Sequence, residues 1–111
     1  MGVLAVGEIV AVDFPFTDGS RLKRRPAMVV ASMTRGDAVV SYITSQPQPG
    51  SVLLPSRFVS TTGGGLPLDS FIRPEKLYTV GPSAVVRRLG EADRRVVHEV
   101  LARLRELFTP R

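Results

Sequence analysis

The stretch DFPFTDGSRLKRRPAMVV, residues 13–30, places a polar, basic segment between two apolar runs. The runs EIVAV before it and AMVVA after it have the β-branched composition typical of strands. Between them, the residues TDGS at 17–20 are typical of a turn. The stretch therefore predicts strands at residues 8–14 and 27–32. A loop that carries Arg21, Lys23, Arg24 and Arg25 and ends at Pro26 should join them.

The composition of the whole chain indicates one globular, cytoplasmic domain, residues 1–111. The chain is 43% hydrophobic and contains no cysteine, which excludes disulfides and cysteine-ligated metals and favours a reducing compartment. No apolar run reaches the roughly 18 residues of a membrane span, and the N-terminus does not read as a signal peptide. The net charge of +5 favours a polyanionic partner, nucleic acid or an acidic protein, although an ordinary soluble surface has the same composition.

The rest of the chain predicts a small barrel closed by a helix. Prolines in QPQPG at 46–50 break the sheet, and Arg35-Gly36-Asp37 forms a hairpin turn. Further strands are expected at 38–44, 52–54, 70–73, 76–80 and 85–88. The fold class is therefore mainly β, with about six short strands.

The C-terminal segment changes to a helical period. Its apolar residues at i, i+3, i+4, i+7 and i+11 share one helix face: Val97, Val100, Leu101, Leu104 and Phe108. Glu91 and Asp93 are expected in the first turn, where acidic residues suit the helix dipole. Val96 and Leu107 flank the apolar face and are weak candidates for subunit contact.

Few residues offer acid–base or metal chemistry. The single histidine, His98, lies on the polar side of the predicted helix, so neither a two-histidine mechanism nor a metal site is expected. The run Gly63-Gly64-Gly65 is not a phosphate cradle, because no Lys-Ser/Thr follows it and no helix starts there. The sequence therefore predicts no cofactor.

The arginines and hydroxyls remain as chemical candidates. Pro26 biases Arg25 to an extended backbone at the start of a buried strand, so Arg25 should be held at the barrel rim while Lys23 and Arg24 extend into solvent. A fixed guanidinium suits bidentate binding of a phosphate. Thr44 ends a strand and should also lie at a rim. A solvated loop and an ordinary strand threonine remain the alternative interpretations.

Three motifs resemble a known family in the same order along the chain. Residues 7–10, 13–20 and 23–27 resemble the opening of the MazF/PemK-type toxins, the mRNA interferases of type II toxin–antitoxin modules. Residues 42–46 resemble the family's second motif, and residues 68–73 with Lys76-Leu77 resemble the third. Glu8 departs from the aspartate that usually follows the glycine, at a position that reads as structural.

The resemblance implies an SH3-like, CcdB-type barrel, a homodimer and metal-independent cleavage of single-stranded RNA. It implies Arg25 and Thr44 as the catalytic residues. A ribose 2′-hydroxyl would attack the adjacent phosphate and leave 2′,3′-cyclic phosphate and 5′-OH ends. The expected RNA-binding residues are Phe16, Thr17, Arg21, Lys23, Arg24, Ser45 and Gln46. A cognate acidic antitoxin is expected to compete for the same basic groove, and no membrane partner is expected.

Two other functions stay open at this point. A CcdB-like toxin that binds a protein target such as gyrase shares the fold but does not need Arg25 and Thr44 together at the rim. A non-catalytic barrel would bind RNA without cutting it.

Overall fold

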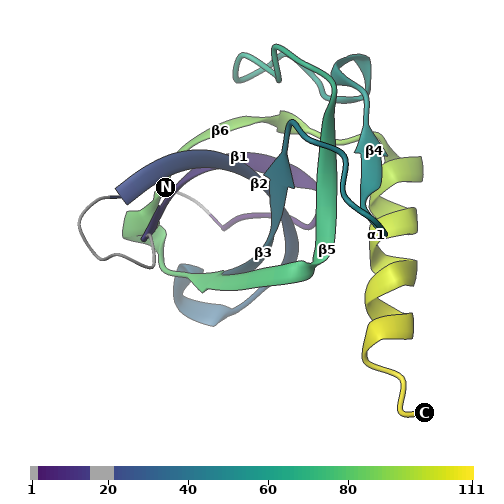
Figure 1. Cartoon of the computed structure of the whole chain (residues 1–111). Coiled ribbons are helices and arrows are strands. Elements are labelled where there is room, and N and C mark those ends of the chain that lie inside the picture. The colour runs from purple at the N-terminus through teal and green to yellow at the C-terminus, as the bar shows by residue number, and fades with distance from the viewer. Residues whose placement is uncertain (1–2, 16–21) are drawn as a thin grey trace.

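The chain folds into one curled antiparallel sheet with a helix along one side (Figure 1). The structure, a computed structural model, describes residues 3–15 and 22–111. Its six-stranded sheet has the order β4-β5-β3-β2-β1-β6. The strands are β1 Glu8–Pro15, β2 Leu22–Ser32, β3 Ala38–Thr44, β4 Val52–Leu54, β5 Ser70–Val80 and β6 Val85–Glu91, and the helix is α1 Arg94–Leu107. The predicted mainly β barrel with a C-terminal helix is confirmed. No helix in the described part of the chain is long and apolar enough to cross a membrane.

The strand β2 is longer than predicted, because the basic residues belong to the strand and not to a loop. Lys23 pairs with Phe14, and Arg24 pairs with Asp13, in the antiparallel ladder with β1. Arg24 Nε also lies 3.1 Å from Asp13 Oδ1, so this cross-strand pair holds Arg24 over the sheet. Arg24 is exposed, as predicted, but its guanidinium is paired, because its opposite neighbour Asp13 supplies a carboxylate.

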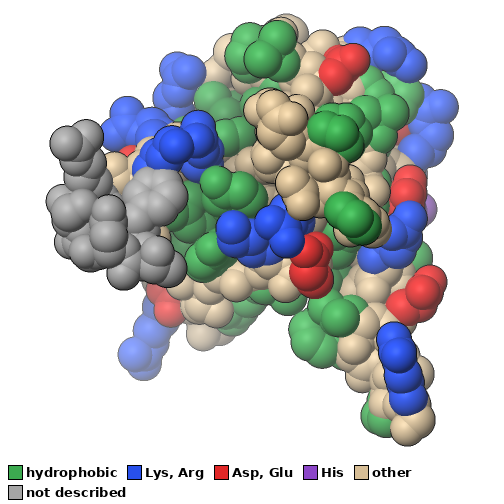
Figure 2. All heavy atoms as spheres, viewed as in Figure 1, with side chains coloured by type: hydrophobic (Ala, Val, Ile, Leu, Met, Phe, Trp, Pro, Cys, Tyr) green, Lys and Arg blue, Asp and Glu red, His purple; other side chains and the backbone are tan. Residues whose placement is uncertain are grey.

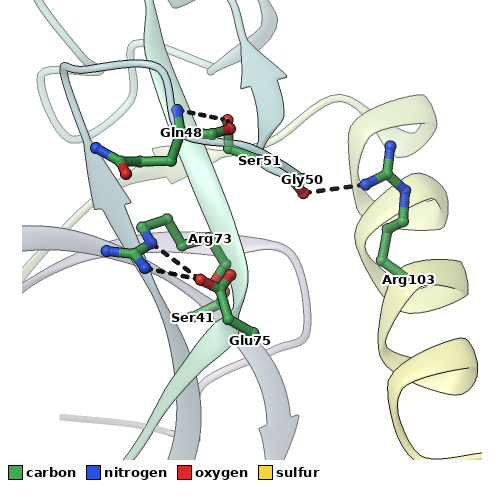
Figure 3. A network of polar contacts seen from close by, with 7 residues as sticks. All are labelled: Ser41, Gln48, Gly50, Ser51, Arg73, Glu75 and Arg103. Atoms are coloured by element: carbon green, nitrogen blue, oxygen red, sulfur yellow. Dashed lines mark hydrogen bonds and ion pairs between the residues drawn. The ribbon is translucent and has the colours of Figure 1, made fainter.

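The strand β5 is continuous where two strands were predicted around Pro74. Pairing with β3 jumps from Ser41↔Leu77 to Tyr42↔Arg73. Pro74 therefore lies in a bulge, where it is not required to donate a ladder hydrogen bond to β3. The Ser41 hydroxyl donates to the Arg73 carbonyl at 2.6 Å and ties the two strands at this point (Figure 3). Figure 1 shows β5 bending sharply along its length. The proline therefore curves the strand instead of ending it.

Two apolar clusters pack on the two faces of the sheet. Successive residues of β1 alternate between them: Ile9 and Ala11 join the cluster beneath α1, whereas Val10, Val12 and Phe14 join the cluster inside the curl. The inner cluster is completed by the rings of Phe14, Tyr42 and Tyr78; the Phe14 and Tyr78 centroids lie 4.7 Å apart. Because the residues of β2 from Ala27 to Val30 are buried on both faces, this part of β2 is central, as predicted.

The helix begins later than predicted and packs with a shifted face. Asp93 is the N-cap and accepts a hydrogen bond from the Arg95 backbone N–H at 2.9 Å, whereas Glu91 ends β6. Val96 is buried in the core, so its assignment to the flank was wrong. Phe108 is 69% exposed, because the last turn of α1 runs past the sheet that the helix covers (Figure 1). The exposed apolar residues at the helix end are therefore Leu107 and Phe108.

Candidate active site

The candidate site forms where β2 and β3 part. Their last ladder pair is Ala27↔Tyr42. Beyond it, the first half of β2 pairs with β1, and the end of β3 pairs with β5. Continuing the register by two residues on each strand brings Arg25 and Thr44 to facing positions across the split. Both residues line a pocket of about 570 Å³, called here the Arg25–Thr44 pocket.

The pocket has an apolar floor and a basic wall. Ala11 of β1, only 6% exposed, lies at its base, and its small side chain leaves the space above it open. The other lining residues are Arg24, Arg25, Pro26, Tyr42, Ile43, Thr44, Ser45, Gln46, Gly65, Leu66, Pro67, Leu68, Ser70, Arg87 and Leu89. They include three arginines and no Asp or Glu. Figure 2 shows Lys and Arg side chains beside hydrophobic ones over the β1, β2 and β6 side of the molecule.

The neighbouring arginines Arg24 and Arg25 differ in their partners. Arg24 is paired with Asp13 through Nε at 3.1 Å and Nη2 at 3.5 Å. Arg25 is half-buried, and its side chain has no hydrogen bond or ion pair to any residue in the described part of the chain. A guanidinium carries five N–H donors and stays protonated. The donors of Arg25 are therefore available to an anionic ligand in the pocket.

The Thr44 hydroxyl is oriented by the chain that follows it. Its Oγ1 accepts a hydrogen bond from the Gln46 backbone N–H at 3.2 Å. Because a hydroxyl has one proton to donate, that proton remains available for a second partner. Thr44 itself is half-buried, and Ser45 and Gln46 are exposed at the pocket edge. The strand end thus presents one hydroxyl donor at the pocket that Arg25 also lines.

The residues expected at the RNA site fall into three groups. Arg25, Thr44, Arg24, Ser45 and Gln46 share the pocket. Lys23 lies on β2 opposite Phe14 and is not among the lining residues. The remaining three, Phe16, Thr17 and Arg21, fall outside the residues that the structure describes.

Two features of the pocket were missed from the sequence. Arg87 reaches it from β6, and the segment 65–68 forms its apolar edge. The next residue is Asp69, whose Oδ1 accepts a hydrogen bond from the Ser56 backbone N–H at 2.8 Å; this bond holds the pKa of Asp69 below its usual value. The sequence signal that could have indicated Arg87 was the pair Arg87-Arg88 in a predicted strand. Successive side chains of a strand point to opposite faces of the sheet, so the two arginines cannot share one role.

The described residues offer no metal cluster. Within residues 3–15 and 22–111, no three His, Cys, Asp or Glu side chains come close enough together to hold a metal ion. His98 is exposed on α1, as predicted, and is not a lining residue of the Arg25–Thr44 pocket. The chemistry open to the pocket is therefore binding and electrostatic stabilisation of an anion by arginines and a hydroxyl.

The family of the chain follows from a match over nearly its whole length. The model of the PemK-like, MazF-like toxin of type II toxin–antitoxin systems matches residues 5–108. The chain belongs to this family. The family resemblance drawn from the three motifs is thus confirmed. No curated protein sequence matches the chain.

Solved structures share the PemK/MazF-like toxin fold at low identity. A chain of the MazE–MazF crystal structure from Deinococcus radiodurans has 24% identity, 96% coverage of both chains and a TM-score of 0.73. MazF from the same organism has 22% identity, covers 96% and 97% of the two chains and has a TM-score of 0.75. An endoribonuclease in complex with its cognate antitoxin from a mycobacterial species has 20% identity, 99% and 100% coverage and a TM-score of 0.68. At these identities the likeness establishes the fold.

Proposed function

We propose that this PemK/MazF-like toxin is an endoribonuclease that cleaves single-stranded RNA at Arg25 and Thr44 without a metal ion. The observation that carries the proposal is the guanidinium of Arg25, which has no partner among the described residues, in a pocket that Thr44 also lines and whose described lining contains no carboxylate. Such a pocket suits a phosphodiester, because its arginines attract the negative charge of the phosphate. Family membership supports the same reaction class.

The reaction requires little from the protein beyond stabilisation and alignment. The ribose 2′-oxygen bonds to the adjacent phosphorus and loses its proton, and the bond from phosphorus to the 5′-oxygen breaks as that oxygen gains a proton. The products are a 2′,3′-cyclic phosphate and a 5′-OH end. Because the substrate supplies the nucleophile, the pocket must stabilise the charge of the pentavalent phosphorane and hold the 2′-hydroxyl in line.

The two residues take different parts in this step. Arg25 donates hydrogen bonds to the non-bridging phosphate oxygens, where charge accumulates in the transition state. An arginine remains protonated, so Arg25 is assigned no role as a general base. The Thr44 hydroxyl donates a hydrogen bond to the same phosphate. Its Oγ1 already accepts a hydrogen bond from the Gln46 backbone N–H, so the hydroxyl proton is free for this contact. Ser45 and Gln46 contact the RNA on the β2–β3 side of the pocket, and Arg24 adds positive charge there while Asp13 holds its guanidinium.

We further propose a homodimer that binds an acidic antitoxin and RNA at one basic groove. The net charge of +5 favours both polyanions, and two of the similar structures are toxin–antitoxin complexes. A carboxylate-rich peptide and an RNA backbone would then exclude one another, and high salt would weaken both complexes. Sedimentation at micromolar concentration tests the dimer directly: a 12.0 kDa monomer that still cuts RNA would contradict a groove shared by two subunits.

The function is tested by incubating the purified protein with a long single-stranded RNA in EDTA. Cleavage with 5′-OH ends, detected by direct labelling with polynucleotide kinase, is the expected result. Arg25→Ala, made in parallel, should leave nearly all of the RNA uncut over the same time and so exclude a contaminating nuclease. Strict dependence on Mg²⁺, or 5′-phosphate ends, would overturn the proposal. RNA that is bound but uncut would favour a non-catalytic barrel.

A further inference from the structure

The glycine run at residues 63–65 lies beside the Arg25–Thr44 pocket but cannot bind phosphate through its own backbone. The N–H groups of Gly63 and Gly65 both donate to the Leu89 carbonyl, at 3.2 and 2.7 Å. The N–H of Gly64 donates to the Thr61 carbonyl at 3.0 Å. All three donors are thus used within the protein. The run therefore needs another explanation.

These glycines allow the loop to lie directly on β6. A Cβ added to Gly63 would come within 2.1 Å of the Arg88 carbonyl oxygen, and one on Gly90 within 2.1 Å of the Ser60 carbonyl oxygen. No real side chain fits at such distances. Because backbone meets backbone on both sides of the contact, the loop has a fixed position relative to β6.

Arg87 projects from β6 into the space beside this loop. Its Nη2 lies 3.8 Å from the position that a Cβ on Gly64 would occupy. The ladder places Arg87 and Pro26 on either side of Ala11, in one row across the sheet, and all three line the pocket. The sheet therefore presents Arg87 on the far side of the pocket floor from β2, the strand that carries Arg25.

The two adjacent arginines of β6 differ in their partners. Arg88 Nε lies 2.8 Å from Glu8 Oε2, so this cation is matched by a carboxylate. Arg87 is exposed and makes no ion pair or hydrogen bond to any side chain within residues 3–15 and 22–111. An unmatched cation at the edge of a pocket whose described lining residues include no Asp or Glu is suited to an anionic ligand.

We propose that Arg87 forms a second phosphate-binding subsite, which holds a phosphodiester next to the scissile one. This inference rests on the proposed RNA cleavage at Arg25. The RNA backbone runs across the Ala11 floor from Arg25 on β2 to Arg87 on β6, and the glycine run keeps the Arg87 side clear of side chains. Arg87 is a binding residue: it fixes the register of the strand and takes no part in the chemical step.

The test measures RNA binding against salt for Arg87→Ala, Arg87→Gln and Arg87→Lys. The probe is a mixed-sequence pool of single-stranded RNA with fluorine at every 2′ position, which binds but cannot attack its own phosphate. Loss of one phosphate contact should reduce the slope of log K against log salt by about 0.7 for the Ala and Gln variants. The Lys variant should keep the wild-type slope. Arg94→Ala, which removes an exposed arginine outside the pocket, is the matched control and should also keep it.

Steady-state cleavage supplies the second readout. Arg87→Ala should raise KM and leave kcat within about twofold, since the contact is the same in the ground state and the transition state. Wild-type slopes in both neutral variants would overturn the subsite even if Arg25→Ala is inactive. If instead the wild type does not cut RNA, the proposed function fails, and the salt slopes still decide whether Arg87 contacts phosphate. Thermal melts of both neutral variants ensure that the slopes compare folded proteins.

Discussion

Two pockets of similar size lie on this molecule and differ in how their charges are matched. The Arg25–Thr44 pocket has a volume of about 570 Å³. The second, called here the helix-end pocket, has about 630 Å³ and is lined by Pro49, Gly50, Pro74, Glu75, Arg103, Glu106, Leu107, Thr109, Pro110 and Arg111. Both acidic and basic side chains line the helix-end pocket, whereas the charged side chains among the described lining residues of the Arg25–Thr44 pocket are all arginines.

Two charged residues of the helix-end pocket, Glu75 and Arg103, have structural partners. Arg103 Nη1 donates to the Gly50 carbonyl at 3.0 Å, and Arg73 Nη2 donates to Glu75 at 2.8 Å (Figure 3). The first contact fastens α1 to the loop after β3, and the second lies within β5. Arg25 and Arg87 have no such partners among the described residues. The comparison teaches that volume alone does not identify the RNA site; the sign of the lining charges and the unmatched arginines Arg25 and Arg87 distinguish it.

The largest expected effect is the loss of Arg25. Arg25→Ala should reduce the cleavage rate by roughly 10²- to 10³-fold, the size seen when one preorganised transition-state donor is removed. Its melting temperature should stay close to that of the wild type, because Arg25 has no side-chain partner to lose within residues 3–15 and 22–111. Arg103→Ala in the helix-end pocket is the matched control and should cleave at the wild-type rate. Equal losses in the two variants would contradict the distinction between the pockets.

A smaller loss is expected at Thr44. Thr44→Ala removes one hydrogen bond to the phosphate, worth about 1.4 kcal/mol or tenfold in rate. Thr44→Ser keeps the hydroxyl and should retain most of the activity. Single-turnover rates of the three proteins check this. If the serine variant is as slow as the alanine variant, the methyl group and not the hydroxyl matters.

Charge matching can itself be altered at Asp13. Asp13→Asn removes the partner of Arg24 and should free that guanidinium for a phosphate, which steepens the salt slope of RNA binding by about 0.7. Glu99→Gln removes the same charge beside Arg103 and should leave the slope unchanged. A steeper slope in both variants would mean that net charge, and not position, controls binding.

The smallest expected effect concerns stability at the start of α1. The hydrogen bond from the Arg95 side chain, with one from the Arg95 backbone, lowers the pKa of Asp93. A lowered carboxyl pKa stabilises the fold above the unfolded value of about 3.9, and this stabilisation is lost as pH falls through the folded value. Asp93→Asn still caps the helix but does not titrate, so its melting temperature should fall less between pH 5 and pH 2 than that of the wild type. Parallel pH dependences of melting would refute this role.

The sequence predicted the strands that local patterns determine. The strands at 38–44 and 52–54 have the predicted bounds, because turn and proline signals flank both. The length of β2 depends on Asp13 facing Arg24, and the continuity of β5 depends on a bulge opposite Ser41. Both are properties of strand pairing, which a local pattern does not contain.

The same limit applies to the site. Arg25 and Thr44 were found from their places at strand ends, and the structure adds that the split between β2 and β3 brings them to one pocket. Arg87 was missed because its place beside Ala11 follows from the sheet order, in which β6 lies next to β1. A long-range neighbour of this kind requires the fold.

The most direct test of the central claim replaces one hydroxyl of the substrate. At a mapped cleavage site, the nucleotide that supplies the 2′-oxygen is changed to a 2′-deoxynucleotide in an otherwise unchanged RNA. Because the pocket supplies stabilisation and the substrate supplies the nucleophile, we expect cleavage at this site to stop while binding in EDTA is retained. Cleavage of the deoxy substrate as fast as the unmodified RNA would show that the nucleophile is not this 2′-oxygen and would contradict the proposed mechanism.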